Sequence, residues 1–319
     1  MKYFNIIMAL TVLFICSPLC YAQNKIAQHL QDISVTIKAG YSEGSGVIIS
    51  RDVPIAKDSK NTVKVNFVWT CAHVVDGLRS ARVVIDGQGR AKTIIEFKDA
   101  QIVKELVEKG RKVGELKMDA KVILYSHAED GEDLALLMVR KIGFVEKNTE
   151  FYLEETNTGI GEPLLHVGSL LGQAGANSMT SGIMSQVGRV LNLGTGDGTV
   201  FDQTTVTAFP GLSGGGVFLR DGRYVGMLVR GSGETFNLIV PVRRMQKWTK
   251  TRDIEWALDK LKPVPSLTEI IKIKPEDAAS DQKNTSPKPD PKTSDFPYLI
   301  KITKRTDAKL PASSALRIK

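Results

Sequence analysis

Short apolar runs rich in β-branched residues alternate with glycine and polar turns through most of the chain, from Ile33 to Trp248. Examples are SGVIIS, VKVNFVWT, KVILYS, LALLMV and FNLIVPV. Runs of this length and spacing indicate strands of a sandwich or barrel and not an alternating α/β chain. Asp221 and Gly222 form a hairpin turn signal between two of these runs. The pattern therefore predicts an all-β domain.

Two segments interrupt this rhythm with helical spacing. Residues 99–112, DAQIVKELVEKGRK, place apolar side chains three and four positions apart and predict a short helical insert. Residues 241–261, PVRRMQKWTKTRDIEWALDKL, predict a C-terminal helix that closes the β domain, with residues 251–262 as its end.

Both ends of the chain differ from the middle. Residues 1–22 carry a lysine, a short apolar core and a small residue before Gln23, which predicts a secretory signal peptide. An uncleaved anchor and lipid attachment at Cys20 are the alternatives. Residues 263–319 are rich in Pro, Lys, Asp and Ser and poor in aromatics, so they predict a largely disordered tail.

Cysteine use and charge add to this picture. Two of the three cysteines lie in the signal segment, so the mature chain keeps Cys71 alone and has no internal disulfide. We expect an exported protein, periplasmic or secreted and of bacterial type, with no stable membrane span after signal cleavage. The net charge is +8, but the basic residues are dispersed without interleaved aromatics, which argues against a nucleic-acid partner.

Three residues in different segments are candidates for one catalytic site. Ser213 lies in the glycine-rich loop PGLSGGG between two apolar runs, His73 follows the run VKVNFVW, and Asp133 directly precedes LALLMV. Serine-nucleophile hydrolysis needs a hydroxyl, an imidazole and a carboxylate that holds the imidazole in one tautomer. Each residue alone has an ordinary structural interpretation: a flexible loop, a packed histidine, a turn aspartate.

The chain order of the three residues strengthens the hypothesis. Histidine, then aspartate, then serine is the order of the chymotrypsin class, and subtilisins and α/β-hydrolases use other orders. Glycines beside Ser213 allow a tight turn that leaves the backbone N–H groups of Gly211 and Ser213 directed toward a substrate. These two amides are the predicted oxyanion hole.

Four motifs resemble the trypsin-like serine peptidases, and most of all the protease domain of the bacterial HtrA branch. They are GSGVII at residues 44–49, TCAHVV at 70–75, DLALL at 133–137 and GLSGG at 211–215. The resemblance implies two six-stranded antiparallel β-barrels within a protease domain over residues 23–250. The first barrel would cover about residues 33–145 and the second about residues 155–248.

The resemblance also implies a substrate-binding region. Its floor would fall near Thr207 and Ala208 and its wall along Val229, Arg230 and Gly231, which favours a small or medium apolar residue before the scissile bond. Two features depart from the pattern. Leu212 stands where digestive trypsins have an aspartate that pairs with a new N-terminus, so no such activation is expected. The tail is too short for the PDZ domain of the HtrA branch.

Two functions remain open at this point. The first is a serine endopeptidase that acts on proteins or peptides and needs no metal or organic cofactor. The second is an inactive protease-like binding or scaffold protein, because Pro210 and Leu212 are unusual neighbours of the Gly211 amide. A functional role for Cys71 beside His73 is a third idea, against which a buried apolar cysteine is the simpler interpretation. The sequence does not specify the oligomeric state.

Overall fold

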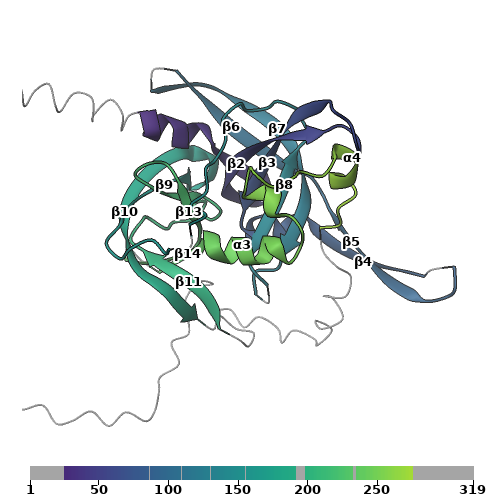
Figure 1. The fold of residues 1–319 in the computed structure, drawn as a ribbon. Helices are drawn as coiled ribbons and strands as arrows, with labels where there is room; N and C mark the ends of the chain where they lie inside the picture. The colour runs from purple at the N-terminus through teal and green to yellow at the C-terminus, as the bar shows by residue number, and fades with distance from the viewer. Residues whose placement is uncertain are drawn as a thin grey trace, which may run out of the picture.

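The computed structural model describes residues 25–275, apart from residues 86, 109, 130, 155, 192–197 and 233–234. The predicted signal peptide over residues 1–22 and the tail beyond residue 275 lie outside the described residues. The described part is mainly β and forms two closed six-stranded barrels that lie side by side (Figure 1). The all-β class with two six-stranded antiparallel barrels is thereby confirmed.

The first barrel closes in the order β1, β2, β3, β8, β7, β6, with antiparallel neighbours throughout. Its strands are β1 (Ser34–Ala39), β2 (Ser42–Pro54), β3 (Thr62–Thr70), β6 (Ala100–Glu108), β7 (Arg111–Ser126) and β8 (Leu134–Val139). The backbone carbonyls of Trp256 and Ala257 accept hydrogen bonds from Arg51 Nε and Trp69 Nε1. The C-terminal segment therefore covers the outside of β2 and β3.

The second barrel closes in the order β10, β11, β14, β13, β12, β9. Its strands are β9 (Pro163–Leu170), β10 (Gly175–Leu191), β11 (Thr199–Thr204), β12 (Gly216–Leu219), β13 (Tyr224–Ser232) and β14 (Phe236–Pro241). Contacts of β1 and β2 with β9 join the two barrels. Segments between strands of both barrels meet at this junction.

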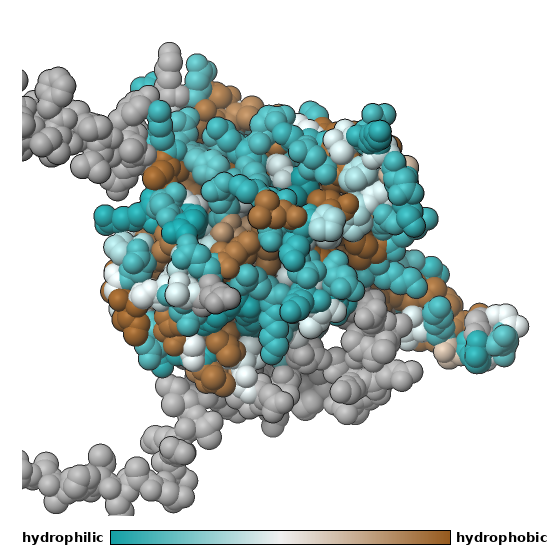
Figure 2. All heavy atoms as spheres, viewed as in Figure 1, coloured by the Kyte–Doolittle hydropathy of each residue, from teal (hydrophilic) through white to brown (hydrophobic). Residues whose placement is uncertain are grey.

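A two-stranded hairpin of β4 (Arg79–Ile85) and β5 (Ala91–Phe97) projects from the first barrel (Figure 1). Val83 and Ile85 are 69% and 76% exposed on this hairpin, and apolar side chains are visible along it in Figure 2. Phe97 anchors its base through ring contact with Tyr125 of β7.

The helices of the described chain are short. A helix over residues 25–32 precedes β1. The others are α2 (Ala72–Val75), η1 (Asp76–Leu78), η2 (Gly172–Ala174), α3 (Val242–Lys250), η3 (Glu255–Ala257) and α4 (Leu267–Ile270).

The helical insert expected over residues 99–112 is wrong, because this segment forms β6 and the start of β7. Ile102 and Val103 are both buried. Consecutive strand residues point to opposite faces, so β6 is covered on both faces at this point. Burial on both faces removes the alternation of apolar and polar residues that marks a half-exposed strand, and the remaining pattern imitates helical spacing.

The C-terminal expectations also need correction. The helix predicted over residues 241–261 ends at Lys250, and Asp253 follows with a φ of 55°, which an α-helix does not accommodate. Beyond residue 263, where a disordered tail was expected, α4 starts with a capping box between Ser266 and Glu269. Ile270 is fully buried. The first residues of the predicted tail thus pack against the core.

Candidate active site

His73 lies on α2, the single helical turn that follows β3. Ala72, Val74 and Val75 on this turn are buried, whereas the His73 side chain is 35% exposed. Anchoring of its three neighbours in the core fixes the backbone of the turn. The sequence WTCAHVV thus presents one imidazole at the barrel junction.

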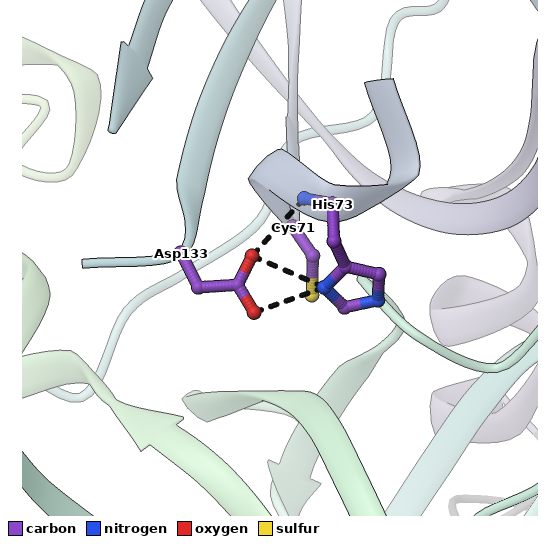
Figure 3. A group of neighbouring side chains, drawn as sticks. All are labelled: Cys71, His73 and Asp133. Atoms are coloured by element: carbon purple, nitrogen blue, oxygen red, sulfur yellow. Dashed lines mark hydrogen bonds and ion pairs between the residues drawn. The ribbon is translucent and has the colours of Figure 1, made fainter. Parts of the chain in front are cut away.

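Asp133 directly precedes β8 and forms hydrogen bonds with His73. Its carboxylate contacts Nδ1 of His73 through Oδ2 at 2.9 Å and through Oδ1 at 3.1 Å (Figure 3). Oδ1 also accepts the backbone N–H of His73 at 3.1 Å. Asp133 is 4% exposed and has a φ of 54°, a conformation that is uncommon outside glycine but that aspartate adopts more often than most residues.

These contacts define the chemistry of the imidazole. A carboxylate only accepts hydrogen bonds, so Nδ1 carries the hydrogen and Nε2 keeps its lone pair. Nε2 is then the ring atom that can accept a proton, and the carboxylate stabilises the imidazolium that results. The structure brings two of the three predicted catalytic residues together.

Ser213 lies on the loop between β11 and β12 of the second barrel, which we call the nucleophile loop (residues 208–214). Gly211 and Gly214 have φ angles of 90° and 87°. A Cβ at Gly211 would come within 2.2 Å of the Ser169 carbonyl oxygen, so a larger residue would have to displace the loop. Among the described residues, His73 makes its ring hydrogen bonds with Asp133, and the Ser213 hydroxyl makes none with Nε2. Catalytic hydrogen bonds are often long before substrate binds.

The amides of Gly211 and Ser213, on either side of Leu212, have no hydrogen-bond partner within the described chain, and neither do those of Ala208 and Phe209 at the start of the loop. The N–H groups of Leu212 and Gly214 are bonded to the carbonyls of Phe209 and Leu228, but those of Gly211 and Ser213 have no such bond. The Pro210 carbonyl accepts the Leu171 N–H at 2.8 Å. In a trans peptide the Gly211 N–H points away from that carbonyl. The unpaired donors of Gly211 and Ser213 are those expected for an oxyanion hole.

Ser45 of β2 ties the nucleophile loop to the first barrel, and sequence reasoning missed this role. Its backbone N–H donates to the Ser213 carbonyl at 2.8 Å, and its Oγ donates to the Gly211 carbonyl at 2.7 Å. The same Oγ accepts the Ser169 N–H at 2.8 Å. Ser45 is fully buried. The backbone and side chain of this one residue therefore hold the carbonyls of both Gly211 and Ser213, the two residues of the predicted oxyanion hole.

Some of the predicted substrate-binding residues also converge. A Cβ at Gly231 would lie within 2.3 Å of the Ala208 Cβ, so the wall and floor touch at these residues. Val229 is buried, whereas Thr207 and Arg230 are half-buried. Asn237, absent from the sequence prediction, brings a buried amide oxygen to the same place, and this oxygen has no hydrogen-bond partner among the described residues. Its Nδ2 donates to the Val206 carbonyl.

Cys71 completes a compact group with His73 and Asp133, whose ligand-type atoms lie within 4.8 Å of one another (Figure 3). The Cys71 thiol is fully buried and donates to the Leu228 carbonyl at 3.4 Å. Burial raises the pKa of this thiol well above its ordinary value. Nucleophilic attack requires the thiolate, so this buried, hydrogen-bonded thiol does not fit the role of a cysteine nucleophile.

His166 of β9 is fully buried and lies next to Gly215, which directly follows the nucleophile loop. Its Nδ1 donates to the Gly216 carbonyl at 2.9 Å, and its Nε2 is buried without a partner in the described chain. A Cβ at Gly215 would lie within 2.5 Å of the His166 ring. Burial lowers the pKa of His166 to about 4.

This histidine predicts a loss of stability in acid. Between pH 6.5 and 4 the unfolded chain binds a proton at His166 and the folded chain does not, so the free energy of unfolding falls as the pH falls through this window. The loss should approach 3 kcal/mol, that is ~1.4 kcal/mol for each pH unit between the two pKa values. Urea denaturation at pH 7 and pH 4 measures it.

His166→Gln should remove most of this pH dependence, whatever its effect at pH 7. The matched control His127→Gln keeps His166 and should keep the acid loss. An unchanged pH dependence in His166→Gln would show that other groups cause it.

The sequence is also similar to known proteins. The family model described as "Trypsin-like peptidase domain" matches residues 44–227. The "Serine protease Do-like HtrA" of Lactococcus lactis subsp. lactis is 28% identical over 190 residues, which cover 58% of this chain and 36% of that protein. The chain thus matches about a third of the length of this curated relative.

The solved structure of Deg5 shows a similar fold. The crystal structure of Deg5 has a TM-score of 0.50 with 18% identity, over 75% of this chain and 97% of that one. The serine endoprotease from Yersinia pestis has a TM-score of 0.49 with 16% identity, over 74% and 68% of the two chains. The resemblance inferred from the four motifs is confirmed by the family match and by the curated relative.

Proposed function

The chain belongs to the family of trypsin-like peptidase domains, and on this premise we propose that it is a serine endopeptidase with Ser213 as nucleophile, His73 as general base and Asp133 as the orienting carboxylate. The observation that carries the proposal is that the Asp133 carboxylate accepts hydrogen bonds from both the ring and the backbone of His73. A buried carboxylate with these contacts orients the imidazole and stabilises its protonated form, so Nε2 can accept and return a proton.

The reaction would proceed through an acyl-enzyme. Nε2 of His73 takes the proton of the Ser213 hydroxyl while Oγ forms a bond to the scissile carbonyl carbon. The N–H groups of Gly211 and Ser213 donate to the oxyanion that develops. His73 then passes the proton to the leaving amine as the peptide bond breaks. Water, deprotonated by His73, releases the acyl group and restores Ser213.

The proposed substrates are proteins and peptides. The contact between Ala208 and Gly231 leaves little width for a side chain before the scissile bond, which supports a small residue there. For the first 22 residues we propose a cleaved signal peptide and hence export. Within the described chain no helix combines the length and the apolar character needed to cross a membrane.

A fluorophosphonate probe tests the proposed nucleophile. It reacts with a serine hydroxyl that an adjacent base activates, so we expect one adduct per chain, mapped to Ser213 by peptide mass spectrometry. Ser213→Ala should abolish labelling and retain the parent's cooperative thermal unfolding. Labelling of a different serine, or equal labelling of the alanine variant, would contradict the assignment.

The scaffold function is the second candidate, and one observation favours it. The hydroxyl of Ser213 lacks a hydrogen bond to His73 within the described chain. A folded protein that neither reacts with the probe nor degrades casein would support a binding role. Labelling at Ser213 would exclude a purely structural role for the triad.

A further inference from the structure

Leu171 combines two unfavourable features beside the nucleophile loop. Its φ of 58° lies in the left-handed region, which costs an L-residue about 1–2 kcal/mol. Its side chain is also 60% exposed, so it gives up much of the ~2 kcal/mol that burial of a leucine provides. In the protein without substrate, neither the backbone strain of Leu171 nor the exposure of its side chain to water is offset by burial of that side chain.

Hydrogen bonds on both sides fix Leu171 in this conformation. Its N–H donates to the Pro210 carbonyl at 2.8 Å. Two residues later the Gln173 N–H donates to Glu43 Oε2 of β2 at 2.8 Å, and this bond lowers the pKa of Glu43. Strain that the surrounding structure maintains in this way is typical of functional positions.

A second large apolar side chain lies next to Leu171. Phe209 is 56% exposed and directly precedes Pro210, the residue bonded to Leu171. Single exposed apolar side chains need no explanation, but two on hydrogen-bonded segments beside the proposed active site are candidates for a shared binding surface. We call Leu171 and Phe209 the apolar rim.

The apolar rim lies on one side of the proposed oxyanion hole. The nucleophile loop is an arch whose feet, Ala208 and Gly214, contact β13 at Gly231 and Leu228. Its apex, at Pro210 and Gly211, contacts Leu171 and Gly172 instead. When the substrate residues before the scissile bond lie along β13, the residues after the scissile bond extend from Ser213 past the apex of the loop. The rim therefore meets residues that follow the scissile bond.

We propose that Leu171 and Phe209 bind an apolar side chain of the substrate, within the first two residues after the scissile bond. This inference rests on the proposed function and names a substrate class for it: polypeptides with an apolar residue on the leaving side. Contact with such a side chain removes the rim from water and uses the outward conformation of Leu171.

Two internally quenched peptides test the proposal. They share the same residues before the scissile bond and carry either Leu-Leu or the similarly sized Asn-Asn after it. The parent should cleave the Leu-Leu peptide with a higher kcat/KM. Leu171→Asn and Phe209→Ser should each lower the Leu-Leu to Asn-Asn ratio about tenfold, the effect of one apolar contact. Asparagine tolerates the left-handed region, so Leu171→Asn preserves the backbone.

Val83→Ser is the matched control, because Val83 is an apolar residue that is 69% exposed on the β4–β5 hairpin, away from the nucleophile loop. It should leave the ratio at the parent value. An unchanged ratio in both rim variants would overturn the proposal. An equal fall in the cleavage of both peptides would also overturn it, because Leu171 would then act only by supporting the nucleophile loop through its hydrogen bond to Pro210.

A binding measurement separates this proposal from the proposed function. Fluorescence anisotropy of the labelled Leu-Leu peptide on the Ser213→Ala background needs no catalysis. Leu171→Asn on that background should weaken binding about tenfold. If Leu171→Asn weakens binding but the probe does not label the parent protein, the proposed enzyme is refuted and the apolar rim is supported. If the probe labels the parent at Ser213 but Leu171→Asn leaves binding unchanged, the enzyme is supported and the apolar rim is refuted.

Discussion

Ser213→Ala is expected to reduce the turnover of a peptide substrate about a millionfold, the usual consequence of removing the nucleophile of a serine triad. The substitution deletes one hydroxyl that makes no hydrogen bond among the described residues, so the fold should be unaffected. Hydrolysis of an internally quenched peptide, followed together with thermal unfolding, measures both effects.

Ser178→Ala is a suitable control, because this part-buried serine lies on β10 and donates to the Gly175 carbonyl. It should keep parental turnover. Hydrolysis by Ser213→Ala at the parental rate would assign the chemistry to another group.

Asp133→Asn should lower kcat about ten-thousandfold, with a much smaller change in KM. The amide keeps the shape of the carboxylate but can donate a hydrogen bond to Nδ1, which places the ring hydrogen on Nε2. His73 then lacks a lone pair toward Ser213. Its imidazolium also loses the adjacent negative charge. Steady-state kinetics and a slowed reaction with the fluorophosphonate probe would report this loss.

Glu132→Gln provides the neighbouring control. Glu132 precedes Asp133 in sequence, but its carboxylate contacts Arg244 of α3. Its replacement should therefore spare kcat. A large fall in kcat for Glu132→Gln with little change for Asp133→Asn would reverse the assignment.

The local pattern of the chain predicted most of the barrel strands, with β6 as an exception, and the segments that carry the three candidate residues. Asp133 was separable from its acidic neighbours because it alone borders the continuous apolar run of β8. The contact of its carboxylate with the His73 backbone depends on a left-handed φ that the residue type does not announce. Sequence therefore located the residue but not the way it holds the histidine.

Long-range pairing accounts for what the sequence did not reveal. The sequence of β6 resembles that of a helix because the strand pairs on both edges and is buried on both faces, so its apolar and polar residues do not alternate. Ser45 was visible only as part of a motif, since its partners Gly211, Ser213 and Ser169 are more than 120 residues away. The role of Asn237 likewise arises from the closure of β14 against β13 and not from its neighbours in sequence.

The buried thiol of Cys71 offers a way to observe the junction between the barrels. In a protein that begins at Gln23 it is the single cysteine, and it lies at the end of β3 with its hydrogen donated to Leu228 of the second barrel. A thiol reagent in solution reaches it only when the two barrels separate or unfold. The rate of modification under native conditions therefore measures how often the junction that carries His73 and Asp133 opens.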